Sequence, residues 1–80
     1  MSLGDEIRIA RQKAFYTQED LARKLGVSLS TVNRWEQNKA RPSAKTMKLI
    51  KTFCRKNDLD YEPIEDAWLY DAARRTEIFS

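Results

Sequence analysis

The stretch from Thr17 to Glu36 constrains the fold most, because it holds two short helical patterns joined by a single tight turn. The first pattern places apolar residues at the spacing of one helix face, namely Leu21, Ala22 and Leu25. Gly26 follows at once, where helices commonly end in the left-handed backbone that glycine adopts at little cost. The second pattern has Val32 and Trp35 on its apolar face. Two helices joined by so short a turn must cross steeply.

Both helices begin at residues that suit helix N-termini. Thr17 and Asp20, three residues apart, have the spacing of a capping box. Ser28 precedes the second helix and suits its N-cap position. We therefore expect a first helix that starts at Thr17 and stops at Gly26, and a second that runs from the Ser28 cap to Glu36.

Three further helices are expected, which makes the chain all-α with about five helices. We place them from about Leu3 to Lys13, near Ala44 to Arg55, and from the region of Pro63 to about Arg75. The proline fits the first turn of the last helix, because that turn has backbone N–H groups without intrahelical partners. Eighty residues allow one domain, 1–80, with a four-helix unit over 2–57 and a C-terminal helix and tail over 58–80.

The last helix has an apolar band that is wide for so small a chain. Ile64, Trp68 and Ala72 form one stripe, and Leu69 widens it. Two readings stay open: the band contacts a second copy of the chain as well as the other helices, or all of it closes the core of a monomer. Phe15 is expected to pack on this C-terminal segment.

The charges are divided unevenly along the chain. Residues 1–57 contain thirteen basic and five acidic side chains, a net charge of +8, whereas residues 58–80 contain two basic and seven acidic ones, a net charge of −5. A concentrated positive field attracts phosphate. The first part is therefore the candidate nucleic-acid-binding part.

Several classes of protein are disfavoured by composition. The chain has no histidine and one cysteine, Cys54, which we expect to be a buried, inert thiol. A Ser-His or Cys-His catalytic pair is thus impossible, and no glycine-rich phosphate loop occurs. We expect no enzyme, no cofactor and no metal site. No stretch approaches the roughly 20 apolar residues of a membrane helix, so we expect no membrane association and a cytoplasmic protein.

The ordered set of residues from Arg11 to Ser43 resembles the phage repressor and Cro-like (Xre-type) helix-turn-helix family. The residues that carry the resemblance are Arg11, Thr17, Gln18, Leu21, Ala22, Gly26, Val27, Ser28, Val32, Glu36, Lys39, Pro42 and Ser43. The likeness covers roughly Ile7 to Asn57. It implies a lambda-repressor-like domain that binds double-stranded DNA.

Base reading is expected from the exposed face of the second helix of the motif. The candidates are Leu29, Ser30, Asn33 and Arg34. Arginine suits the O6 and N7 atoms of guanine, and asparagine suits the N6 and N7 atoms of adenine. Leu29 either touches a thymine methyl group or turns into the core and reads nothing.

Phosphate contacts are implied for residues around this helix. They are Thr17, Gln18, Ser28, Gln37, Asn38, Lys39, Arg41 and Lys45. Asn38 stands where the family usually has glycine, and asparagine tolerates a left-handed backbone better than most residues. The resemblance also implies a structural salt bridge between Arg11 and Glu36.

These features predict a sequence-specific transcriptional regulator, most readily a repressor that binds an inverted repeat as a homodimer. Two alternatives remain: the antitoxin of a toxin-antitoxin pair, whose partner is a toxin, or a protein-interaction adaptor that binds a protein such as a co-regulator and reads no DNA.

Overall fold

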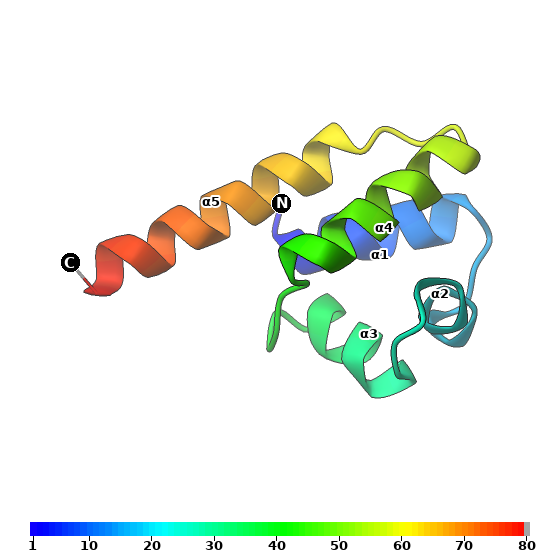
Figure 1. Ribbon diagram of the computed structural model, residues 1–80, viewed down its shortest axis with the longest axis horizontal. Coiled ribbons are helices and arrows are strands. Elements are labelled where there is room, and N and C mark those ends of the chain that lie inside the picture. Colours follow the sequence, from blue (N-terminus) through cyan, green and yellow to red (C-terminus); the bar gives the residue numbers. More distant parts are fainter. Residues whose placement is uncertain (80) are drawn as a thin grey trace.

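The computed structural model describes the backbone of residues 1–79 and the side chains of residues 1–71, and this part of the chain is all-α (Figure 1). It has five helices: α1 (Leu3–Lys13), α2 (Gln18–Leu25), α3 (Leu29–Glu36), α4 (Ala44–Lys56) and α5 (Glu62–Phe79). The all-α class is thereby confirmed. The first four helices start where the sequence pattern places them, and α4 ends one residue later than expected.

Each of the first four helices starts at a hydroxyl side chain. The N-caps are Ser2, Thr17, Ser28 and Ser43, and each accepts a hydrogen bond from a backbone N–H in the first turn. The caps at the starts of α1 and α2 are complete capping boxes, closed by Asp5 and Asp20. Gly26 ends α2 with φ of 70°, the left-handed conformation expected of it.

The core lies where α1, α2, α3 and α4 converge with the first turn of α5. Its fully buried side chains include Ile7, Val32, Cys54 and Ile64. Tyr16 packs its ring edge-on against Phe53, with ring centroids 5.1 Å apart. This small core determines the orientation of α3, because Val32 and Trp35 are both buried in it.

The N-terminus of α1 lies directly against the C-terminus of α3, and Gly4 makes this approach possible. A Cβ atom at Gly4 would lie 2.5 Å from the carbonyl oxygen of Trp35 and 2.8 Å from that of Glu36. The Gly4 N–H also donates a hydrogen bond of 3.0 Å to the side-chain oxygen of Asn38. A larger residue at position 4 would therefore push α1 away from the end of α3.

Three non-glycine residues at helix ends have left-handed backbones: Phe15 after α1, Asn38 after α3 and Asp58 after α4. Asn38 has φ of 59°, as expected. Phe15 has φ of 60° and is 94% exposed, so the expectation that it packs on the C-terminal segment is wrong. The left-handed backbone at Phe15 sets the direction of its side chain, and the ring therefore points into solvent instead of packing on α5.

The fifth helix is longer than the sequence pattern indicates. It begins one residue before Pro63 and continues to Phe79, past the expected end near Arg75. Figure 1 shows its first half beside α1 and its second half extending beyond the other helices. Ile64 is buried, Trp68 is partly buried, and Leu69 is 54% exposed. The side chain of Ala72 lies outside the described residues.

Candidate nucleic-acid interface

The helix α3 buries one face and presents the other to solvent. Val32 and Trp35 point into the core, while Ser30, Arg34 and Gln37 are exposed. Positions 30, 34 and 37 lie on one side of a helix, because they are separated by about one turn each. The exposed side is therefore a continuous row of hydrogen-bonding groups.

Leu29 stands at the first position of this helix and is 48% exposed. It is therefore outside the core, and the alternative in which it turns inward does not hold. Its side chain adds an apolar surface beside Ser30 at the end of α3 that is nearest the turn from α2.

A buried ion pair braces the other end of α3. The Arg11 guanidinium holds the Glu36 carboxylate with two hydrogen bonds, from Nε at 2.7 Å and from Nη2 at 3.0 Å. A third hydrogen bond runs from Arg11 Nη1 to the carbonyl oxygen of Tyr16, at 2.8 Å. The two side chains are only 12% and 4% exposed. The hydrogen bonds with Glu36 raise the pKa of Arg11 above its ordinary value.

Hydrogen bonds extend from this ion pair to the exposed face. Gln18 donates to Glu36 Oε1 at 3.1 Å, and its own side-chain oxygen accepts from Asn33 at 3.3 Å. Asn33 in turn accepts a hydrogen bond of 2.9 Å from Gln37. The orientation of Asn33 is thus determined by α2 and by the end of α3. Gln18 and Asn33 are both half-buried.

Thr17 and Ser28 lie at the N-termini of α2 and α3, where both are exposed. Each hydroxyl is already engaged in capping: Thr17 accepts from the Asp20 N–H at 3.0 Å, and Ser28 accepts from the Thr31 N–H at 3.1 Å. Helix N-termini favour anions, because several backbone N–H groups there have no intrahelical partner.

Most of the remaining expected phosphate contacts lie at the end of α3, in the loop that follows it and in the first turn of α4. Gln37, Asn38, Lys39 and Lys45 are exposed. The Lys39 N–H donates to the carbonyl oxygen of Arg34 at 2.9 Å, and the Arg34 guanidinium donates back to the carbonyl oxygen of Lys39 at 3.3 Å. The loop is therefore tied to the end of α3.

Arg41 differs from the other expected phosphate contacts, because its side chain is only 16% exposed. Its guanidinium lies 4.2 Å from the ring centroid of Trp68 and 2.8 Å from a carboxylate oxygen of Asp71. Sequence reasoning missed this contact with α5. The sequence offers one signal for this contact. Trp68 and Asp71 are three residues apart, so they lie on the same face of the last helix, where they can meet a cation such as Arg41.

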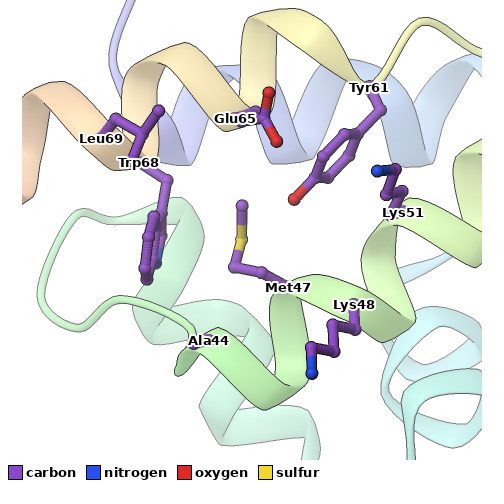
Figure 2. Close-up of a pocket in the computed structure, with 8 residues that line it drawn as sticks. All are labelled: Ala44, Met47, Lys48, Lys51, Tyr61, Glu65, Trp68 and Leu69. Carbon is purple, nitrogen blue, oxygen red and sulfur yellow. The ribbon is translucent and has the colours of Figure 1, made fainter.

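A small apolar cavity of about 190 Å³ separates α4 from α5 (Figure 2). Figure 2 shows Met47 pointing into it from α4, and Trp68 descending from α5 on one side. On the other side the Lys51 ammonium lies 5.8 Å from the centroid of the Tyr61 ring.

The described part of the chain offers neither a metal site nor a membrane-spanning helix. It contains no group of three or more acidic or cysteine side chains arranged to hold a metal ion. Its helices are also too short or too polar to cross a membrane.

Comparison with protein families finds a match to the helix-turn-helix family over residues 7–57, well over half of the chain. The geometry of α2, the Gly26 turn and α3 is the helix-turn-helix itself. The chain thus belongs to this helix-turn-helix family, in the phage repressor and Cro-like (Xre-type) form that the sequence resembles, and is a DNA-binding regulator. Comparison with curated proteins and with solved structures finds no match.

Proposed function

We propose that this protein is a sequence-specific transcriptional repressor of the cytoplasm that inserts α3 into the major groove of its operator. The observation that carries the proposal is the division of α3 into a buried face and an exposed polar face. The buried face is locked in place by the core and by the Arg11–Glu36 ion pair. A rigid helix with a polar outer row is what major-groove recognition requires.

Base reading is assigned to the residues that this row presents. Arg34 has the bidentate geometry that suits guanine, and the exposed Leu29 suits contact with a thymine methyl group. Ser30 and Asn33 supply further hydrogen bonds to base edges. Asn33 is the residue whose orientation is most restricted, because it is bonded to both Gln18 and Gln37.

Phosphate contacts are assigned to two groups of residues around this helix: the first at the N-termini of α2 and α3, the second from the end of α3 through the following loop to the first turn of α4. Thr17, Gln18 and Ser28 serve the first group, and Gln37, Asn38, Lys39 and Lys45 the second. About six such contacts would give a plot of log affinity against log salt a slope near −5. These contacts position the protein on DNA and carry no base information themselves.

Dimerisation is proposed to involve α5, with Leu69 at the interface. Leu69 is 54% exposed and belongs to the wide apolar band of α5, so it is available for contact with a second copy. A dimer would read two half-sites with centres about 34 Å apart, or a multiple of that distance. Sedimentation equilibrium tests this part of the proposal: Leu69→Glu should shift the protein toward monomer, while Leu49→Glu, a matched change at an exposed leucine of α4, should not.

The deciding experiment is selection of binding sites from a random duplex library with the purified protein, at two salt concentrations. The proposal expects a symmetric motif with one fixed half-site spacing at both concentrations. A matched selection with Arg34→Ala should lose the preference at one base pair in each half-site. Binding that is sensitive to salt and yields no motif would refute sequence-specific regulation.

A further inference from the structure

The loop that precedes α4 is held by the last helix at two successive residues. Arg41 stacks on the ring of Trp68 and pairs with Asp71. The Trp68 indole N–H donates a hydrogen bond of 2.7 Å to the carbonyl oxygen of Pro42. The Pro42 side chain is fully buried. One aromatic side chain thus contacts both residues, and Figure 2 shows it reaching from α5 down to this loop.

The charges at this contact argue against a direct role for Arg41 on phosphate. Its guanidinium already has a carboxylate at 2.8 Å and an aromatic face at 4.2 Å. To reach a phosphate it would have to give up both interactions, and the negative charge of Asp71 would remain near the DNA backbone. Lys39, two residues earlier, is exposed and can reach a phosphate without that loss.

We infer that Arg41, Trp68 and Asp71 form an anchor that holds the loop from Asn38 to Ser43 in its DNA-binding conformation. In this arrangement Trp68 and Asp71 are positioning residues that act through Arg41 and Pro42. The inference rests on the proposed function and adds to it a dependence of DNA affinity on α5 within one subunit. Without the anchor, only a fraction of the molecules have the loop in its binding conformation, and the apparent affinity falls in proportion to that fraction.

The test measures operator affinity over a range of salt concentrations for Asp71→Ala, Arg41→Ala and the double variant. Asp66→Ala is the matched control, because it removes an exposed acid from the same helix. A simple charge effect predicts that losing either acid strengthens DNA binding. The anchor predicts instead that Asp71→Ala weakens binding about three- to fivefold, the size of one partly exposed ion pair, while Asp66→Ala does not weaken it.

Two further results separate an anchor from a phosphate contact. Arg41→Ala should weaken binding with an unchanged salt slope, whereas loss of a phosphate contact would reduce the slope by about 0.9. Asp71→Ala should have little added effect in the Arg41→Ala background, since it acts through Arg41. Stronger binding by Asp71→Ala, a reduced slope for Arg41→Ala, or additive effects would each overturn the inference.

A measurement without DNA keeps this inference distinct from the proposed function. The Lys39 amide is bonded to the carbonyl oxygen of Arg34, so its hydrogen exchange reports on the loop. Trp68→Phe and Asp71→Ala should accelerate exchange at Lys39 and leave the amides of α2 unchanged, which also verifies that the variants fold. Unchanged exchange at Lys39 would refute the anchor. Failure of the wild-type protein to select a DNA motif would refute the proposed function, and the exchange result would stand separately.

Discussion

The Arg34 guanidinium donates a hydrogen bond of 3.3 Å to the backbone carbonyl of Lys39. The residue proposed to read guanine is therefore joined to the residue proposed to contact phosphate. Because this hydrogen bond is exposed, breaking it on DNA binding costs only about 1 kcal/mol, less than a bidentate contact with guanine provides.

Alanine at these two positions should have different effects on DNA binding. Arg34→Ala should weaken operator binding by about 1 to 3 kcal/mol and relax specificity at one base pair. Lys39→Ala should weaken binding equally on operator and random DNA and lower the salt slope by about 1. Fluorescence anisotropy titrations on both duplexes at several salt concentrations measure these quantities. Equal losses of specificity in the two variants would contradict the division of roles.

Removing the acid of the buried ion pair should destabilise the fold severely. Glu36→Ala leaves the Arg11 guanidinium buried without its carboxylate, which costs about 3 kcal/mol in the free energy of unfolding. Urea denaturation measures the change. Arg8→Ala is the control, because it breaks an exposed pair with Asp5 and should cost less than about 1 kcal/mol. Similar urea midpoints for Glu36→Ala and Arg8→Ala would show that the buried Arg11–Glu36 pair contributes no more to stability than the exposed pair.

Glycine at position 15 should stabilise the protein. Phe15 pays a steric cost of about 1 to 2 kcal/mol for its left-handed backbone, and its ring gains nothing from burial. Phe15→Gly removes that cost and loses about 0.5 to 1 kcal/mol to chain entropy, so the net gain is about 0.5 kcal/mol.

Gly26→Ala is the opposite test by thermal denaturation. A Cβ atom at Gly26 meets no other atom within 4 Å, so any loss of stability comes from its φ of 70° alone. We expect a loss of about 1 kcal/mol. A higher melting temperature for Gly26→Ala, or a lower one for Phe15→Gly, would show that backbone strain does not control these two turns.

The capping boxes should make stability depend on pH in the acid range. Hydrogen bonds to the Ser2 side chain and backbone lower the pKa of Asp5, and those to the backbone and side chain of Thr17 lower the pKa of Asp20. Both carboxylates therefore stabilise the fold above the ordinary value of 3.8, and this contribution is lost as the pH falls through their lower folded-state pKa values.

Urea midpoints between about pH 5 and pH 2 test this dependence. Asp20→Asn should be less stable than the wild type at the upper end and should lose stability less steeply as the pH falls. Asp66→Asn, an exposed acid outside the caps, should follow the wild-type curve. Parallel curves for Asp20→Asn and the wild type would contradict the contribution of the cap.

The single thiol should react only when the protein opens. Cys54 is fully buried, and burial raises its pKa to about 11. At pH 8 almost none of it is thiolate, so labelling with a thiol reagent should be slow in buffer and should accelerate steeply through the urea unfolding transition. Fast labelling of the native protein would show that α4 opens locally.

Local features of this fold were predictable from short segments of sequence. The caps at Thr17 and Ser28, the glycine end of α2 and the left-handed Asn38 depend on residues within a few positions of each other. Their energies come from hydrogen bonds and torsions inside one turn, so the sequence pattern carries them directly. The spacing of apolar residues likewise indicated which face of α3 would be buried.

Contacts between distant segments were decided only by the tertiary structure. The approach of Gly4 to the end of α3 and the contacts of Trp68 and Asp71 with Arg41 depend on how helices far apart in the chain pack. By itself, the sequence determined the number of helices, the N-caps of α2 and α3 and the DNA-binding family. Only packing decided which cations stay exposed, because burial and pairing depend on neighbours that lie tens of residues away.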